Sequence, residues 1–435
     1  MGIADVYRQI NKQIEKNQQT YHGDRERWHI LREVLNWIGQ PDRHLKIIHV
    51  VGTDGKGSTG AMTAAALHGA GYRIGHFSSP AILDDRDMIQ LNGAAIRETD
   101  FISSYRRILR ALEKHGGQVN TLTKFEWWTL IALDYFYHHE VQFAIVEAGL
   151  AGLCDATNAI EAPLIVAFTK IDLDYEANDT DRISEITQDK AGAIKPGAVV
   201  INYPGQAREV TKLLQERTVA VGASWYDGEK PSITIIRSTP TGLVLNVDHY
   251  KQLQLPLTGS YQVKNLAIVL EIVRVLRKRG TRIPVADLAQ ALANMKVRGR
   301  MEYDAKNNIL YDGAHNPSEI ENLVTSLHAW HLEAKPVYVL GLMKDKNWRD
   351  ILEQILPDTD QVIAVKPDTP QGMSADELAA KIVMQSNVNV EIADDPEAAI
   401  NLARRIRKDT KRLIVVTGSF YTLRAIHAGG FTLNE

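Results

Sequence analysis

Short apolar runs alternate with amphipathic segments along most of this chain. In residues 25–39 the apolar side chains recur at helical spacing, so the first 40 residues predict helices. The apolar run 45–51 precedes glycines and predicts a buried parallel strand. The same alternation continues, with further strands expected at 72–77, 141–149 and 163–171 and helices at 58–72, 125–139 and 181–194. Strands alternating with helices predict an α/β fold whose parallel sheet is covered on both faces.

The pattern changes twice further along. Around 219–258 it alternates with period two, which predicts a small antiparallel insert, and 261–280 predicts a long amphipathic helix ended by Gly280. After about residue 300 a second series of strands and helices begins. We therefore predict two domains. Residues 1–298 form a P-loop-type parallel-sheet domain that carries the insert, and residues 299–435 form a smaller Rossmann-like α/β domain.

Composition narrows the class of protein. The 435 residues include 50 basic and 53 acidic side chains, a formal charge of −3, which argues against a nucleic-acid partner. Cys154 is the single cysteine, so neither an intrachain disulfide nor a cysteine zinc cluster is available. The polar N-terminus has no apolar signal core, and no apolar run is long enough for a bilayer. We expect a cytoplasmic protein without a membrane partner.

The stretch GTDGKGST lies between a predicted strand and a predicted helix, where backbone N–H groups and the helix dipole bind phosphate. It departs from the strict phosphate-loop pattern because Gly57 separates Lys56 from Ser58. A plain turn is the alternative, but three glycines around a lysine fit it poorly. We expect the lysine to neutralise phosphate charge and a hydroxyl to reach Mg²⁺ or phosphate. The predicted nucleotide contacts here are Gly52, Thr53, Asp54, Gly55, Lys56, Gly57, Ser58 and Thr59.

Other candidates lie where predicted strands and helices end. Glu147 closes an apolar strand, at the sheet edge where ligands of open α/β sheets bind, and its carboxylate suits Mg²⁺. The alternative is a solvated acid.

Three further candidates lie later in the chain. Lys190, taken alone, is better interpreted as a surface residue. Arg300 carries a planar guanidinium, whose donors suit the geometry of a phosphate. In 311–320, Asn316 and Pro317 predict a capped helix start, which leaves an exposed Asp312 and His315 unexplained.

Taken together, these segments resemble the folylpolyglutamate synthase and dihydrofolate synthase family of the ATP-dependent Mur ligase superfamily. The family loop is G-T-N-G-K-G-S, so Gly57 is typical of it. The resemblance covers roughly residues 20–425 in order, through KIIHVVGT, LNGAAI, FEWWTL, DATN, DKAGAIKPG, RGRMEY, YDGAHNP and VTGSFY. It implies an acid–amino-acid ligase: ATP phosphorylates a folate-like carboxylate, and the amino group of L-glutamate attacks the acyl phosphate.

The resemblance also implies roles for single residues. Lys56 and the loop glycines hold phosphate, and the metal ligands are Ser58, Ser79, Glu147 and Lys190, with Lys190 carbamylated beside a second Mg²⁺. Asn265 lies on the adenine side, and Arg300 and Asp312 contact the nucleotide from the domain seam. The residues implied in catalysis are Lys56, Lys190, Asp312 and His315. The family is usually monomeric, so we expect a monomer that uses ATP and one or two Mg²⁺ ions.

The chain departs from the family pattern in two regions. Tyr175 replaces a metal-ligand histidine, with Asp174 or Glu176 as oxygen donors nearby, and Tyr261 replaces the histidine of H-Q-x-x-N. On the pterin side, basic or polar family residues are lost at Ala81, Met88, Gln90 and Leu153. Nucleotide chemistry is thus expected to be kept while the acceptor pocket is remodelled. The alternatives are a paralogue that ligates another carboxylate or amino acid, a dihydrofolate synthase, and a nucleotide-binding protein without ligase activity.

Overall fold

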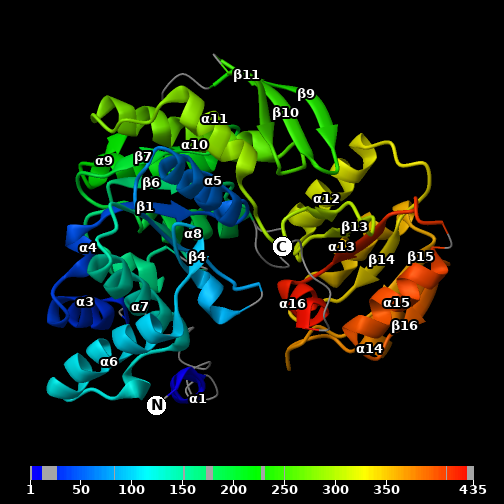
Figure 1. Cartoon of the computed structure of the whole chain (residues 1–435), viewed down its shortest axis with the longest axis horizontal. Helices are drawn as coiled ribbons and strands as arrows, with labels where there is room; N and C mark the ends of the chain where they lie inside the picture. Colours follow the sequence, from blue (N-terminus) through cyan, green and yellow to red (C-terminus); the bar gives the residue numbers. More distant parts are fainter. Residues whose placement is uncertain are drawn as a thin grey trace.

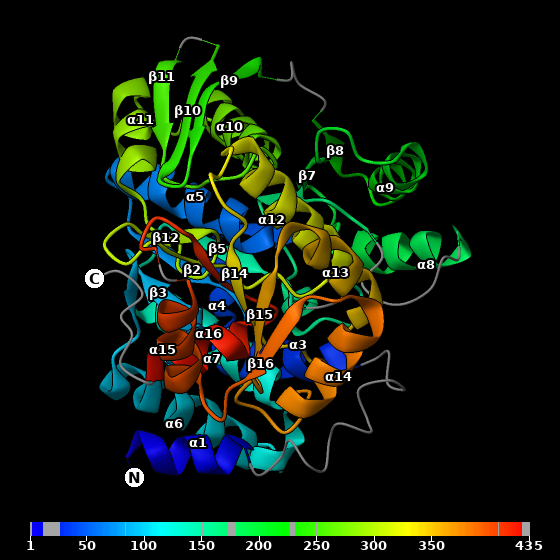
Figure 2. The same ribbon diagram turned by 90° about the vertical axis from the view of Figure 1, so that its right-hand side faces the viewer.

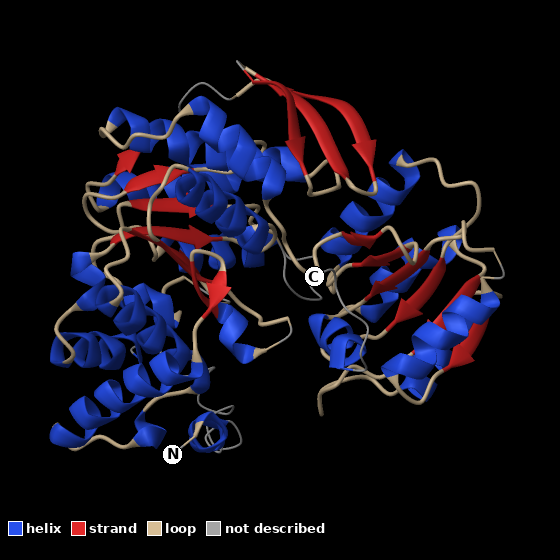
Figure 3. Cartoon of the chain, in the orientation of Figure 1, coloured by secondary structure: helices blue, strands red, loops and turns tan. Residues whose placement is uncertain are grey.

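The computed structural model describes residues 2–11, 27–82, 84–149, 152–172, 180–226, 231–248, 250–407 and 409–428. Its helices and strands gather around two separate main sheets, with a third, small sheet above them (Figures 1 and 3).

The first sheet has the strand order β4-β3-β2-β5-β1-β6-β7-β8. Its parallel strands are β1 (Lys46–Val51), β2 (Ile74–Phe77), β5 (Phe143–Glu147), β6 (Ile165–Phe168), β7 (Val199–Ile201) and β8 (Ser224–Trp225). The predicted parallel sheet is therefore confirmed. Two short antiparallel strands that the sequence did not predict, β3 (Ile89–Leu91) and β4 (Ala94–Ala95), extend one edge.

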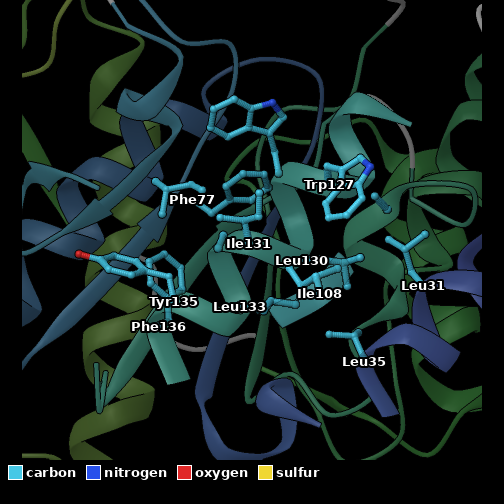
Figure 4. Packing of buried hydrophobic residues seen from close by; sticks show 14 of the residues in the cluster. Leu31, Leu35, Phe77, Ile108, Trp127, Leu130, Ile131, Leu133, Tyr135 and Phe136 are labelled. Carbon is cyan, nitrogen blue, oxygen red and sulfur yellow. The ribbon is translucent and has the colours of Figure 1, made fainter. Parts of the chain in front are cut away.

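Helices cover both faces of this sheet. One face packs against α5 (Lys56–Gly69), α10 (Gln262–Lys278) and α11 (Val285–Asn294). The other packs against α1 (Ile3–Asn11), α3 (Arg27–Trp37), α6 (Glu98–Lys114) and α7 (Lys124–His138) at one end, with α4 (Pro41–His44) beside α7. At the other end lie α8 (Thr180–Ala191) and α9 (Arg208–Ala220). Figure 4 shows Trp127, Leu130 and Ile131 of α7 inside the cluster that also holds Leu31, Leu35 and Ile108.

The insert is a three-stranded antiparallel sheet of β9 (Ile233–Thr239), β10 (Gly242–Val247) and β11 (Tyr250–Leu255). It begins later than predicted, because residues up to 220 continue helix α9 and residues 224–225 join the parallel sheet as β8. Strand β11 lies against α11, so the insert extends the layer of helices over the first sheet.

The second main sheet has the order β12-β13-β17-β14-β15-β16. Its strands are β12 (Glu302–Asp304), β13 (Ile309–Tyr311), β14 (Val337–Leu340), β15 (Gln361–Ala364), β16 (Asn389–Ile392) and β17 (Ile414–Thr417); only β12, not predicted, is antiparallel. Helices α12 (Pro317–Ala329), α13 (Trp348–Ile355) and α14 (Ala375–Gln385) cover one face, and α15 (Pro396–Ile406) and α16 (Phe420–Ala428) the other (Figure 2). The predicted mixed α/β fold class is confirmed.

The chain passes from the first main sheet and its helices to the second main sheet and its helices in residues 295–301. This stretch lies between α11, which ends at Asn294, and β12, which begins at Glu302. Our predicted division between residues 298 and 299 falls in this stretch and stays a prediction. Within the described ranges, none of the helices combines the length and the apolar character that a bilayer-spanning helix needs.

Candidate active site

The glycine-rich loop joins β1 to α5. Gly52 and Gly55 have φ of +156° and +85°, and α5 begins at Lys56. A side chain added at Gly55 would come within 2.5 Å of the Asn265 amide oxygen. Glycine is therefore required where α10 approaches the loop, and the loop N–H groups lie at a helix N-terminus, the arrangement that binds phosphate.

Two lysines meet at this loop. The Lys56 ammonium donates to the carbonyl oxygens of Gly52 and Thr53 over 3.1 and 2.9 Å. The Lys190 ammonium, from the end of α8, donates to the same Gly52 oxygen over 3.3 Å. Lys190 is only 2% exposed, so the interpretation of this lysine as a surface residue is wrong. That interpretation failed because the residue type alone does not reveal that the end of α8 contacts the glycine-rich loop.

A chain of amides ties α10 to the start of α5. The Asn265 amide donates to Gln262 over 2.9 Å, and the Gln262 amide donates to the Ser58 hydroxyl over 3.1 Å. All three side chains are buried. Thr59 is buried as well, and its hydroxyl has no hydrogen-bond partner among the described residues. Of the two predicted hydroxyls, Ser58 is therefore the one that borders the cleft.

Glu147 lies at the end of β5, next to the loop. It is 2% exposed, and burial raises the pKa of its carboxyl to about 7, although the nearby charges of Lys56 and Arg300 oppose the rise. The Ser79 backbone N–H donates to it, while its Oε2 atom has no hydrogen-bond partner in the described part of the chain. A buried carboxylate with a spare oxygen beside two serines suits a hard cation such as Mg²⁺. No cluster of three His, Cys, Asp or Glu side chains forms within the described ranges, so hydroxyls, phosphate or water must complete such a site.

The second main sheet contributes Arg300, which precedes β12, and Asp312, which follows β13; the two lie at the same end of this antiparallel pair. Asp312 is buried rather than exposed, because its carboxylate accepts the backbone N–H groups of Met301 and Ala314 over 2.7 and 2.9 Å. Burial raises the pKa of Asp312 to about 6, and the Arg300 charge opposes that rise. Asp312 thus shapes the turn that carries Arg300 while it lines the cleft.

Glu319 is a site residue that we did not predict. Its carboxylate accepts from Arg300 Nη1 over 3.0 Å and lies 2.9 Å from His315 Nδ1. The predicted start of α12 is confirmed, since Asn316 caps it by accepting the Glu319 N–H and Pro317 follows. The Asn-x-x-Glu spacing of a capping box was the available signal for Glu319.

One cleft gathers much of the predicted set. It is bordered by Asp54, Gly55, Ser58, Asn265, Arg300 and Asp312. Two contacts bridge it: Asn316 donates to Asp54 over 3.2 Å, and Lys170 donates to Ser318 over 2.7 Å. His315 contacts Glu319 but does not border the cleft. Neither do Glu147, Ser79 and Lys190. Asp174, Tyr175 and Glu176 lie outside the described residues.

The four departing positions on the predicted acceptor side differ in burial, and Ala81 and Gln90 are half-buried. Met88, at the end of the 3-10 turn η1 (Asp85–Met88), is buried in the core cluster, whereas Leu153 is 40% exposed. On the same turn, Asp85 pairs with Lys124 over 3.2 Å and, across the domain seam, with Arg424 over 2.8 Å. Lys124 and Arg424 therefore place positive charge near the predicted acceptor side, although the arginines of the family pattern are absent there.

Residues 299–420 match the family "Mur ligase, glutamate ligase domain". Over 415 residues the chain is 28% identical to dihydrofolate synthetase of Saccharomyces cerevisiae, an alignment that covers 90% of this chain and 94% of the relative. It superposes on Mycobacterium tuberculosis folylpolyglutamate synthase complexed with ADP and AMPPCP with a TM-score of 0.83, at 25% identity, over 92% of this chain and 94% of the other. The bifunctional folylpolyglutamate synthase/dihydrofolate synthase of Yersinia pestis, complexed with AMPPNP and Mn, gives a TM-score of 0.76 at 26% identity, covering 92% of each chain.

The fold, the loop and the match of residues 299–420 to the Mur glutamate ligase domain indicate an ATP-dependent ligase. Within that class, relatives and structural neighbours are folylpolyglutamate and dihydrofolate synthases, which confirms the resemblance that the motifs indicate.

Proposed function

We propose that this protein is an ATP-dependent amide ligase that joins L-glutamate to the carboxylate of a tetrahydrofolate-like acceptor through an acyl phosphate. One observation carries the proposal: Lys56, Lys190 and Glu147 surround the loop at the carboxyl edge of the first sheet, and Arg300 and Asp312 face the loop from the second. This is the distribution of charge that phosphoryl transfer needs, because that reaction depends more on neutralisation and alignment than on covalent help.

The chain's own groups divide the work. The N-terminus of α5 and the Lys56 ammonium bind the phosphates. Arg300 adds charge from the other domain. The cleft between the domains keeps water from the acyl phosphate while the amino group of glutamate attacks. Glu147 with Ser58 and Ser79 would hold a divalent cation. When bound, that cation supplies positive charge to the transferring phosphate.

Further details belong to the same proposal. We assign Lys190 as the carbamylated lysine, since its buried ammonium lies beside the loop. The acting species is a cytoplasmic monomer, and the domains divide at residues 298 and 299. The positions of Asp54, Lys56 and Arg300 support nucleotide binding between those domains.

A second candidate is a paralogue that ligates another carboxylate. The observation in its favour is the acceptor side, where Met88 is buried in the core and Leu153 presents an apolar side chain to solvent. Neither supplies the charge-assisted hydrogen bonds with which arginine binds an anionic substrate.

Turnover with defined acceptors separates these candidates. The protein is incubated with Mg-ATP, L-glutamate and either tetrahydrofolate or dihydropteroate, and phosphate release and product mass are measured. Phosphate release that depends on tetrahydrofolate, with a product heavier by one glutamate residue, supports the proposal. Dependence on dihydropteroate alone identifies a dihydrofolate synthase. Turnover that ignores both pterins favours the second candidate, and ATP binding without any turnover contradicts a ligase. Lys56→Met is the inactive control.

A further inference from the structure

Glu319 lies in the third position of α12, and its side chain is 12% exposed. Its two oxygens serve different partners. Oε1 accepts from Arg300 Nη1 over 3.0 Å. Oε2 accepts the His315 backbone N–H over 3.1 Å and lies 2.9 Å from the His315 ring Nδ1, which also contacts the Gly313 carbonyl oxygen over 2.9 Å. One carboxylate therefore links the start of α12 to the guanidinium that borders the nucleotide cleft.

Arg300 and His315 also share a second contact, the ring of Phe420. The Arg300 guanidinium stacks over the ring of Phe420 at 4.4 Å, and the His315 ring meets Phe420 edge-on at 6.1 Å. Glu319 thus binds Arg300 through an N–H group at the edge of the guanidinium, and the Phe420 ring packs against the guanidinium face. A guanidinium has five N–H donors, so donors remain for a ligand in the cleft that Arg300 borders.

The charges of this group are interdependent. Burial alone would raise the pKa of Glu319, but His315 and Arg300 hold it well below its usual range. Burial lowers the pKa of His315 and Lys346 adds to that effect, yet the Glu319 carboxylate outweighs both and raises it. Glu319 therefore stays ionised and faces the guanidinium of Arg300 and the imidazole of His315.

We propose that Glu319 is a positioning residue for the nucleotide: it anchors Arg300 over Phe420 so that the free guanidinium donors meet the phosphates. The proposal deepens the proposed function and rests on it for the identity of the ligand as ATP. Two other roles are possible for the same carboxylate. In the first, the carboxylate serves only to cap helix α12. In the second, it competes with phosphate for Arg300. These roles make opposite predictions for nucleotide affinity.

Glu319→Gln separates the three roles. The substitution removes a negative charge beside Arg300, and it lowers the pKa of His315 because the Glu319 carboxylate is the main group that raises it. Loss of a negative charge cannot by itself weaken binding of phosphates. Weaker binding consequently reports on the position of Arg300. Glu321→Gln, on an exposed position of the same helix, is the matched control.

Affinity for ADP is measured by calorimetry at pH 7.5, and the His315 pKa by NMR of ring-labelled protein. We expect Glu319→Gln to weaken ADP binding roughly tenfold, the worth of one charge-assisted hydrogen bond, and to lower the His315 pKa, while Glu321→Gln changes neither. In an Arg300→Met background, Glu319→Gln should cause no further loss, because Glu319 acts through Arg300. Thermal melting verifies that each variant is folded.

Unchanged affinity in folded Glu319→Gln would leave a helix cap only, and tighter binding would show a competitor; both overturn the proposal. A further loss in the Arg300→Met background overturns it as well. These readouts need no acceptor, so they stay informative even when wild-type protein shows no turnover with folates, the result that would contradict the proposed function instead.

Discussion

The ammonium groups of Lys56 and Lys190 donate to one and the same oxygen, the carbonyl of Gly52, over 3.1 and 3.3 Å. Two like charges this close repel each other in a buried setting. The arrangement becomes favourable when an anion binds between them or when one lysine loses its charge. A bound phosphate would supply the anion, and carbamylation of Lys190 would turn the second cation into an anion.

Removal of the Lys190 side chain should abolish most ligase activity. In Lys190→Ala the buried group beside the loop is lost, so we expect a fall in kcat of at least about a hundredfold, of the order seen when one hydrogen-bond donor to the transition state is removed. The measurement is phosphate release under saturating Mg-ATP. Lys195→Ala is the control, since Lys195 lies over the Trp28 ring. Wild-type rates in Lys190→Ala would contradict the assigned role.

Metal affinity should increase as pH rises through about 7. The Glu147 carboxyl, whose pKa burial raises to about 7, must be ionised to bind a cation. We expect the Mg²⁺ concentration for half-maximal activity to fall between pH 6 and pH 8 in wild type. Glu147→Gln should show weak binding at both pH values. An equally pH-sensitive Mg²⁺ titration in Glu147→Gln would assign the effect to another group.

The same carboxyl has an opposite effect on stability. Its folded pKa lies above the unfolded value of 4.5, so the folded protein holds the extra proton between pH 4.5 and 7. The unfolding free energy should therefore fall as pH rises through that window, by up to about 3 kcal/mol from this group. Denaturant melts of wild type and Glu147→Gln at pH 5 and pH 8, without Mg²⁺, test this. The variant should lack that part of the pH dependence, and identical curves for the two proteins would disprove it.

Asp54→Asn should tighten nucleotide binding several-fold. Burial, followed by the charge of Glu319, raises the pKa of Asp54, and its Oδ2 has no hydrogen-bond partner among the described residues. Asparagine retains an acceptor for Asn316 and removes a negative charge from the cleft, worth on the order of 1 kcal/mol. ADP calorimetry gives the affinity, and Asp54→Ala, which lacks the acceptor, is the comparison. Weaker binding in Asp54→Asn would mean that the carboxylate itself helps to hold the ligand.

A basic residue at position 153 should improve use of an anionic pterin acceptor. Leu153 is exposed, so Leu153→Arg adds a donor without burying charge, and we expect KM for tetrahydrofolate to fall several-fold with kcat little changed. Val219→Arg, an exposed apolar position on α9, controls for added charge. An equal fall of KM in both variants would point to overall charge rather than to the acceptor site.

Much of the fold was predictable because local patterns agree with tertiary structure. The strands β1, β5 and β6 are apolar runs buried on both faces, and Asn316 with Pro317 starts α12 as expected. The short strands β3, β4 and β12 were missed because two or three residues carry too little periodicity. The insert was placed too early, since an alternating pattern does not reveal which sheet a strand joins.

The candidate site was less predictable where it depends on contacts between distant segments. Lys190 was buried rather than exposed, and Asp312 bonds to the turn at Met301. Glu319 was missed because a helix-capping acid and a site residue look alike in sequence. Gln262 was missed because its bond to Ser58 spans two helices far apart in the chain. Such relationships are set by packing, which one sequence alone does not display.

The Phe420 ring has an evolutionary consequence. It lies so close to Gly313 that a side chain there would overlap the ring, and it also borders Gly299. The segments RGRMEY, YDGAHNP and VTGSFY, which look independent along the chain, therefore meet at one aromatic ring. Across related sequences, glycine at position 313 should covary with an aromatic residue at 420, and a smaller residue at 420 should permit alanine at 313.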